Sequence, residues 1–323
     1  MAKYSSPDDQ RLIVKVSKLY YEENLNQDDI VERLHLSRSK VSRILQRARD
    51  EGIVQINVIS PNGIMSELET RLESRFHLKE AIIIESHATD PQSTITHQLG
   101  ITAAAYFVRT LQNNDLIGIS WGSTLHEMVT VLQPIETKGV QVVQIIGGLG
   151  QPEAEVHATD LCRRLSRILS ARLTLLPAPG IVDNLRTKEA FLTDTYVQRA
   201  MDLFTKLDVA YVGIGSPTPD SLVIKDGSII NNNELSNLLS HHAVGDIALR
   251  FFDNFGQPVL NDVDSRVIGI NLLQLATIKR VVGVAGGPDK PSAILGALRG
   301  GLIDILITDS ITAQTVLDLS GYK

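Results

Sequence analysis

Seven short β-rich segments, separated by stretches with helical spacing, recur between residues 81 and 309 and restrict the fold more than any other feature. They are "AIIIE" (81–85), "DLIGIS" (115–120), "VQVVQII" (140–146), "LTLLP" (173–177), "DVAYVGIG" (208–215), "RVVGVAGG" (280–287) and "IDILITD" (303–309). Strands that alternate with helices form mostly parallel sheets with helices on both faces, so the predicted fold class is α/β. Ligands of such folds bind beyond the carboxyl ends of the strands.

The first 60 residues have a different pattern, which predicts three helices. Ser6 and Pro7 begin the first helix, Asn26 caps a second over "QDDIVERLH", and Ser37 caps a third over "RSKVSRILQRARDE", which Gly52 ends. The inward-facing stripes are Leu12, Ile13, Val16, Leu19 and Tyr20 on the first helix, and Val41, Ile44, Leu45 and Ala48 on the third. This order of helices is typical of a helix-turn-helix domain.

Charge is unevenly distributed along the chain, whose net charge is −6. Residues 1–60 hold 10 basic and 9 acidic side chains, and residues 33–49 hold six basic side chains and no acidic one. Arg38 and Lys40 stand in the first turn of the third helix, where cations oppose the helix dipole. This arrangement favours an anionic partner, and the phosphates of DNA are the expected one.

The third helix is therefore predicted to be a recognition helix that enters the major groove of double-stranded operator DNA. Its candidate DNA-binding residues are Ser37, Arg38, Ser39, Lys40, Ser42, Arg43 and Arg47. The alternating segment "IVQINVI" (53–59) is predicted to form a wing. Two alternatives stay open: a charged helix face that is only solvated, and a basic segment that contacts proteins.

The turn residues "SPNG" (60–63) mark the best domain boundary in the chain. Beyond them, the apolar stripe of a charged helix packs either on its own domain or on a second subunit, and we expect it near a subunit contact. This stripe consists of Met65, Leu68, Leu72 and Phe76. The predicted domains are a helix-turn-helix domain over 1–59, a linker with its helix over 60–78, and an effector-binding and oligomerisation domain over 79–323.

The stretch "GISWGSTL" (118–125) runs from a predicted strand through a tight turn into a predicted helix. Gly122 permits the turn, Ser123 can cap the helix, and Thr124 adds a second hydroxyl. Amides and hydroxyls at a helix N-terminus suit a phosphate group, although an ordinary capped turn has the same pattern. Other glycine-containing loops after strands let a ligand approach the backbone, and they bring in Gly147, Gly148, Asp246 and Lys290.

Several classes of chemistry find no support in the sequence. The glycine loops match no nucleotide fingerprint, so no cofactor is expected. Cys162 is the only cysteine and the histidines have no metal-site context, so no metal is expected. "GISWGS" contains the letters G-x-S-x-G, yet Ser120 ends the predicted strand rather than standing in the turn, which disfavours a hydrolase. Without a signal or membrane-spanning segment, the expected location is cytoplasmic, with no membrane partner.

The chain resembles the SorC family of bacterial sugar-responsive transcriptional regulators over nearly its whole length. The markers occur in order: "LYYEENLNQDDIVERLHLSRSKVSRIL", "GISWGSTL", "KGVQVVQIIGG", "VGIGSP", "VGDIALRFFDNFG", "VAGGPDKPSAILGALRGG" and "ILITDSITA". The resemblance implies a winged-type helix-turn-helix domain joined to a Rossmann-like α/β effector domain related to sugar-phosphate isomerases. It also implies assembly into a homodimer or homotetramer.

The resemblance also implies roles for the candidate effector-binding residues. Gly122, Ser123 and Thr124 would hold the phosphate, Trp121 would line the sugar, Asp246 would accept from its hydroxyls, and Lys290 would add a charged contact. Some relatives have a Lys or Arg before the Gly-Gly turn, where this chain has Ile146. This difference argues against a covalent imine and against recognition of deoxyribose 5-phosphate or of a doubly phosphorylated sugar. The expected function is a regulator of a carbohydrate operon, not an enzyme, controlled by a sugar or sugar phosphate. The alternative is a sugar-phosphate isomerase or deaminase with an appended DNA-binding segment.

Overall fold

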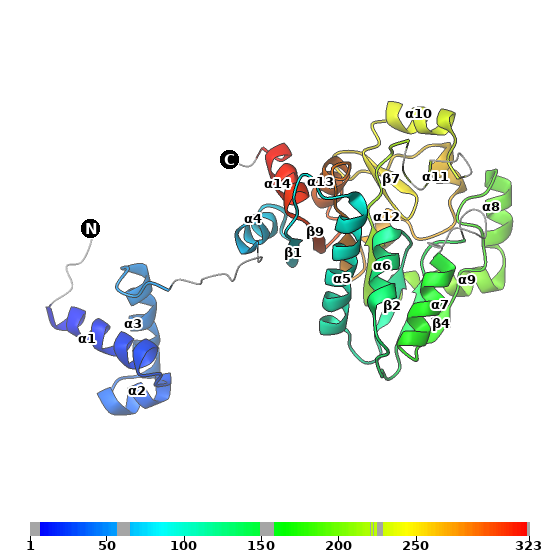
Figure 1. Ribbon diagram of the computed structural model, residues 1–323. Helices are drawn as coiled ribbons and strands as arrows, with labels where there is room; N and C mark the ends of the chain where they lie inside the picture. Colours follow the sequence, from blue (N-terminus) through cyan, green and yellow to red (C-terminus); the bar gives the residue numbers. More distant parts are fainter. Residues whose placement is uncertain are drawn as a thin grey trace. The chain divides into compact units, whose positions relative to one another are not determined.

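The computed structural model describes residues 7–56, 65–148, 158–219, 221, 223–224 and 229–321. The chain divides into two compact units, Met1–Ser60 and Pro61–Lys323, each with its own apolar core (Figure 1). The segment "SPNG", where the sequence predicts a boundary, lies outside the described residues, as does Ser6 of the first predicted helix.

Three helices around a buried apolar centre form the small unit. They are α1 (Pro7–Ser17), continued by the π-helical turn η1 (Lys18–Glu22), then α2 (Gln27–Leu34) and α3 (Arg38–Asp50). Asn26 and Asp29 form a capping box at the start of α2, and the Ser37 hydroxyl accepts from the Lys40 amide at the start of α3. The three predicted helices are confirmed, and the predicted stripe of α3 is buried in the same core as Ile13.

The segment after α3 matches the prediction only in part. Gly52 has a φ of +70°, a conformation that favours glycine, and α3 has ended just before it, as expected. Residues 53–56 of the predicted wing are not in a strand, and residues 57–59 lie outside the described part of the chain.

A seven-stranded parallel sheet is the centre of the large unit. Its strands are β1 (Glu80–Ile84), β2 (Leu116–Ile119), β3 (Gln141–Gln144), β4 (Arg172–Thr174), β5 (Val209–Gly213), β8 (Val281–Val284) and β9 (Ile305–Asp309). They lie in the order β1-β9-β8-β5-β2-β3-β4, and every neighbouring pair is parallel. All seven predicted strands are confirmed, and with them the α/β fold class.

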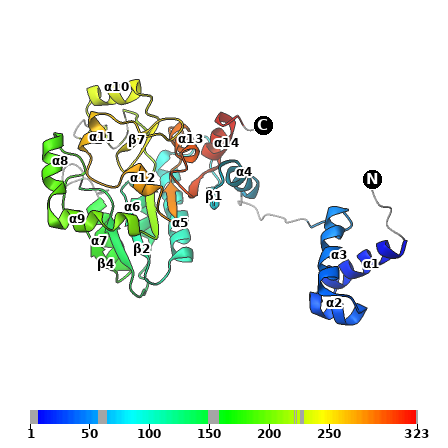
Figure 2. The same cartoon turned by 180° about the vertical axis from the view of Figure 1, so that it is seen from behind.

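Helices cover both faces of this sheet. One face packs against α5 (Gln92–Thr110), α6 (Ser123–Val131) and α7 (Ala158–Ile168). The opposite face packs against α12 (Leu272–Leu275), α13 (Pro291–Arg299) and α14 (Ser310–Leu319) (Figure 2). Along β5, Val209 and Tyr211 belong to the first core, whereas Ala210 and Val212 belong to the second, so the strand is buried on both sides.

Helix α4 (Ser66–Phe76) is part of the large unit. Leu72 is completely buried, and Met65, Leu68 and Phe76 pack against the same core. Of the two alternatives for this apolar stripe, packing on its own domain is therefore the one that the structure shows. The other helices in the described part of this unit are α8 (Leu185–Leu192), α9 (Thr195–Met201), η2 (Phe204–Lys206), α10 (Asn232–Ser240) and α11 (Asp262–Arg266).

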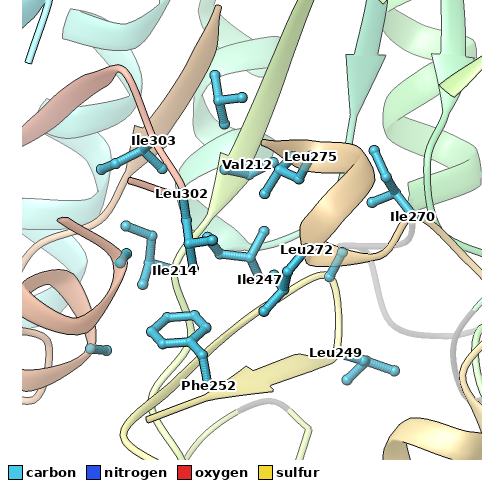
Figure 3. Close-up of a cluster of buried hydrophobic side chains, with 14 of the residues drawn as sticks. Val212, Ile214, Ile247, Leu249, Phe252, Ile270, Leu272, Leu275, Leu302 and Ile303 are labelled. Atoms are coloured by element: carbon cyan, nitrogen blue, oxygen red, sulfur yellow. The ribbon is translucent and has the colours of Figure 1, made fainter. Parts of the chain in front are cut away.

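A small antiparallel pair, β6 (Gly245–Ile247) and β7 (Arg250–Phe252), lies outside the main sheet and was not predicted. Its apolar side chains pack under the end of β5. Figure 3 shows Ile247 and Phe252 of the pair directed toward Ile214, with Leu272 of α12 beside them. This packing fixes the position of Asp246, the middle residue of β6.

Candidate functional site

A pocket of about 250 Å³ lies at the carboxyl ends of β2, β5 and β8, which are neighbours in the sheet. We call it the β2–β5–β8 pocket. Its described lining is Gln92, Thr96, Trp121, Gly122, Ser123, Thr124, Gly213, Ile214, Gly215, Thr218, Ser221, Val223, Asp246, Ala248, Val284, Ala285, Gly286, Asp289 and Lys290. The position agrees with the expectation that ligands of parallel α/β folds bind beyond the strand ends.

The pocket brings together six of the eight candidate effector-binding residues, which are Trp121, Gly122, Ser123, Thr124, Asp246 and Lys290. Gly147 and Gly148 are not in its described lining, and their backbones are engaged elsewhere. The amide of Gly147 donates to the Ile268 carbonyl at 3.1 Å, and the amide of Gly148 donates to the Ala178 carbonyl at 2.9 Å. A Cβ at position 147 would lie 2.4 Å from the Ala178 oxygen, so close backbone packing explains this glycine.

The turn before α6 presents backbone amides to the pocket. Gly122 is the N-cap residue, with φ 132° and ψ 157°, and among the described residues no side chain caps the first amides of the helix. The predicted capping role of Ser123 is therefore wrong, because Ser123 is the first helical residue and is exposed. The first amides of a helix lack partners inside the helix, so this uncapped end has free donors.

Thr124 holds the same turn against the neighbouring strand. Its hydroxyl donates to the carbonyl oxygen of Val284, the last residue of β8, at 3.1 Å. The start of α6, which follows β2, and the end of β8 are thus joined through one side chain.

Asp246 is a buried carboxylate at the back of the pocket, with 4% of its surface exposed. Gly215 and Asp246 exchange two backbone hydrogen bonds of 2.9 and 3.1 Å, and a Cβ on Gly215 would lie 1.9 Å from Oδ1 of Asp246. Oδ2 accepts from the Leu249 amide at 3.1 Å, whereas Oδ1 has no donor among the described residues. Burial raises the pKa of Asp246 to about 6, and Lys290 opposes that rise.

Lys290 immediately precedes α13 and is mostly buried in the pocket lining. Burial lowers the pKa of its ammonium group, while Asp246 and Asp289 act in the opposite direction. No ion pair joins Lys290 to either carboxylate within the part of the chain that the structure describes. The described pocket lining therefore contains one cation, Lys290, and two carboxylates, Asp246 and Asp289, that are close enough to influence it.

Five polar residues of the described pocket lining were missed by the sequence reasoning: Gln92, Thr96, Thr218, Ser221 and Asp289. The hydroxyl of Ser221 is buried and has no hydrogen-bond partner in the described structure, which is unfavourable unless a ligand or water supplies one. Gln92 donates to the Gly286 carbonyl at 3.0 Å and so supports the glycine loop. For Thr218, Ser221 and Asp289 the available signal was their position shortly after a predicted strand. Gln92 and Thr96 lie farther along, in α5, and had no such signal.

The G-x-S-x-G letters around Ser120 do not form a nucleophile elbow. The Ser120 side chain is 1% exposed; its hydroxyl donates to the Trp121 carbonyl at 3.4 Å and accepts from the Gly213 amide at 3.3 Å. Ser120 thus links β2 to β5, which supports the interpretation that it ends the strand.

The candidate DNA-binding residues lie on helix α3 and at its N-cap, and most of them are exposed. Ser37, Arg38, Ser39, Lys40, Ser42 and Arg43 are exposed, whereas Arg47 is half-buried and forms a 2.6 Å ion pair with Glu51. Arg38 lies 3.6 Å from Asp28 of α2. The Lys40 ammonium has no partner among the described residues, so it is the cation best placed to meet an external anion.

Comparison with known proteins agrees with this geometry. Residues 19–55 match the family profile "Winged helix-turn-helix DNA-binding", and residues 60–318 match "Putative sugar-binding domain". The deoxyribonucleoside regulator of Bacillus subtilis is 33% identical over 309 residues, covering 96% of this chain and 98% of the relative. The sorbitol operon regulator of Klebsiella pneumoniae is 33% identical over 316 residues, with the same shares covered. The chain belongs to the SorC family of transcriptional regulators.

Solved structures give the same result for this SorC-family chain. The full-length sorbitol operon regulator SorC of Klebsiella pneumoniae superposes with a TM-score of 0.73 at 32% identity, covering 96% of this chain and 99% of that one. A transcriptional regulator of Streptococcus pneumoniae TIGR4 superposes with a TM-score of 0.73 at 28% identity, covering 80% of this chain and 98% of that one. No helix in the described residues is long and apolar enough to span a membrane.

Proposed function

We propose that this regulator binds operator DNA through α3 and is controlled by a sugar or sugar phosphate bound in the β2–β5–β8 pocket. The observation that carries the proposal is the joining, in one pocket, of the uncapped start of α6 with Asp246 and Lys290. A phosphorylated polyol needs these three kinds of group: amide donors, an acceptor for hydroxyls and a cation.

The phosphate would bind at the turn formed by Gly122, Ser123 and Thr124. Free helical amides and the positive end of the α6 dipole favour an anion there, and the exposed Ser123 hydroxyl adds a donor. Gly122 permits the geometry, because its φ of 132° is strained for any residue with a side chain, although nothing lies within 4 Å of a Cβ placed on it.

The sugar hydroxyls would bind deeper in the pocket. The free Oδ1 of Asp246 accepts from one hydroxyl, the unpartnered hydroxyl of Ser221 bonds with another, and Trp121 covers the carbon skeleton. Lys290 contacts the phosphate or a ring oxygen as a charged donor.

The ligand would act by binding one state of the protein more tightly than the other. Differential affinity of this kind shifts operator binding by roughly 1–3 kcal/mol. A homodimer or homotetramer, which we also propose, would present two recognition helices to the two halves of an operator. We place this action in the cytoplasm, where bacterial operators lie.

A ligand panel tests the proposal on the full-length chain. Thermal-shift and calorimetric titrations would use sorbitol, sorbitol 6-phosphate, deoxyribose, deoxyribose 5-phosphate, fructose 6-phosphate and inorganic phosphate. We expect a phosphorylated sugar to bind, and Gly122→Ala to weaken its binding by about tenfold or more. Gly301→Ala is the matched control, because Gly301 also has a positive φ, has open space around its Cβ position, and is not in the described pocket lining. Binding of a free polyol alone would refute the phosphate site.

One observation favours an enzyme as a second candidate. Asp246 has a pKa of about 6 beside a lysine, and a carboxyl group with such a pKa is suited to general acid–base catalysis. Incubation with the same sugar phosphates decides the matter: turnover that Asp246→Asn abolishes would support an isomerase or deaminase. The relatives compared above are named as regulators, so regulation remains the proposal.

A further inference from the structure

Helix α4 covers the free edge of the large sheet with two carboxylates. Among the described residues, β1 is the terminal strand of the sheet, and β9 is its one paired neighbour. On its other side, the amide of Ala81 donates to Glu73 at 2.9 Å, and the amide of Ile83 donates to Glu69 at 3.0 Å. Together with the buried Leu72, these bonds fix α4 in register on β1.

Asp309, at the end of β9 and next to β1, is a buried carboxylate that accepts hydrogen bonds from four donor groups. Its Oδ1 accepts from the Ser86 hydroxyl and the Thr312 amide, both at 3.0 Å. Its Oδ2 accepts from the Gly287 amide at 2.7 Å and the Thr312 hydroxyl at 2.6 Å. Because Ser86 follows β1 and Gly287 follows β8, this carboxylate connects the ends of two strands that are not neighbours.

The loop that follows β8 belongs to the β2–β5–β8 pocket. Gly286 lines the pocket, and a Cβ on it would lie 2.4 Å from Oδ2 of Asp309, so the loop rests directly on that carboxylate. The Lys290 amide donates to the Gly287 carbonyl at 3.1 Å. A ligand that moves Lys290 therefore acts on the same short loop that Asp309 holds.

We infer that Asp309 and Ser86 are positioning residues through which occupation of the pocket acts on α4. The contacts are continuous: they run from the 286–290 loop to Asp309, then to Ser86 and β1, and then to the two glutamates of α4. In sequence, α4 is the first described helix after α3, so the chain leads from it to the DNA-binding unit. The inference rests on the proposed function, because it concerns how the same pocket controls DNA binding.

The test compares three changes in the full-length chain. Ser86→Ala removes one donor to Asp309. Glu69→Ala with Glu73→Ala removes both edge contacts, whereas Glu69→Gln with Glu73→Gln keeps an acceptor oxygen at each position. Glu67→Ala is the matched control, because Glu67 is exposed on the same helix and has no partner among the described residues.

Three measurements are made on each variant. Hydrogen exchange of the ligand-free chain follows the amides of Ala81, Ile83 and α4. Operator affinity is measured with and without sorbitol 6-phosphate and deoxyribose 5-phosphate as probes, and probe affinity is measured separately.

We expect Ser86→Ala to speed exchange at α4 and, like the double alanine variant, to reduce the probe-induced change in operator affinity by about fivefold or more. Probe affinity and ligand-free operator affinity should each stay within about threefold of the wild type. The double glutamine variant should respond like the wild type. Unchanged exchange at α4 in Ser86→Ala, or a wild-type response in the alanine variants, overturns the inference. A wild type that binds neither probe refutes the proposed function for these ligands instead, and the exchange result then decides the inference alone.

Discussion

The hydroxyl of Thr124 donates to the carbonyl of Val284 at 3.1 Å, so the second hydroxyl of the "GST" turn is already engaged inside the protein. The phosphate we propose would therefore depend on backbone amides more than on this side chain. The bond has a structural role, because it connects the start of α6 to the end of β8 across the pocket.

Replacing Thr124 tests this role. Thr124→Val keeps the shape but leaves the Val284 carbonyl without its donor, and we expect a loss of about 1–2 kcal/mol in the free energy of unfolding. Thr124→Ser retains the donor and should lose less. Urea unfolding at equilibrium measures both variants. Equal stability of the valine variant and the wild type would show that the bond contributes nothing.

The raised pKa of Asp246 predicts that the free energy of unfolding depends on pH in an unusual way. The folded chain keeps a proton on Asp246 up to about pH 6, whereas the unfolded chain loses it near 3.8. The stability that Asp246 contributes is thus fully present below about pH 4 and is lost as the pH rises through 6. Asp246→Asn should match the wild type near pH 4 and exceed it by up to about 3 kcal/mol at pH 8. Unfolding curves across this range give the difference, and a variant that is less stable at pH 8 contradicts the prediction.

The affinity for the ligand should also depend on the protonation of Asp246, but it should increase as the pH rises, whereas the stability decreases. If the ionised Asp246 accepts from a sugar hydroxyl, affinity falls below pH 6 as the carboxylate is protonated, by about tenfold per pH unit at most. A phosphate group also titrates near pH 6, so Asp246→Asn serves as the control for its contribution. Calorimetric titrations at several pH values would separate the contribution of Asp246 from that of the phosphate. Identical pH profiles for the wild type and the variant would show that Asp246 does not contact the ligand.

Lys40 is expected to contact DNA phosphate. Lys40→Ala should weaken operator binding and reduce the slope of log affinity against log salt by about one for each recognition helix bound. Lys15→Ala, which removes an exposed charge from α1, is the control for general electrostatic attraction. Arg47→Ala should have a smaller effect than Lys40→Ala, since Arg47 is paired with Glu51. Fluorescence anisotropy at several salt concentrations measures the slopes, and a slope unchanged in Lys40→Ala would place the phosphate contacts elsewhere.

The strands of the main sheet were predictable because they are short runs rich in apolar residues, and central strands such as β5, with the sequence "VAYVG", are buried on both faces. The edge strand β4 ("RLT") is more polar and has no buried residue. The β6–β7 pair was not predictable for a physical reason. Its strands have three residues each and are joined by Ala248 and Leu249, which both have positive φ values, 53° and 62°. Turns of this kind usually contain glycine or asparagine, so the sequence carries no turn signal there.

The lining of the pocket could also be predicted only in part. Asp246 and Lys290, which the sequence reasoning took from glycine-containing segments, both line the pocket, and their contact with a ligand stays a prediction. Glycine is ambiguous, because it permits close approach either of a ligand or of another part of the backbone. At Gly147 the neighbour is the backbone of residues 178 and 179. Ser221 was missed because nothing in a sequence reveals that a hydroxyl is buried without a partner.

The carboxylates that α4 places on β1 also bear on where this protein can be cut. A fragment beginning at residue 79, the predicted start of the effector domain, would lose Glu69, Glu73 and Leu72 together. It would expose the amides of Ala81 and Ile83 on an apolar strand, which is a template for pairing with other chains. A soluble effector fragment therefore has to begin before Met65, so that the strand keeps its natural protection against aggregation.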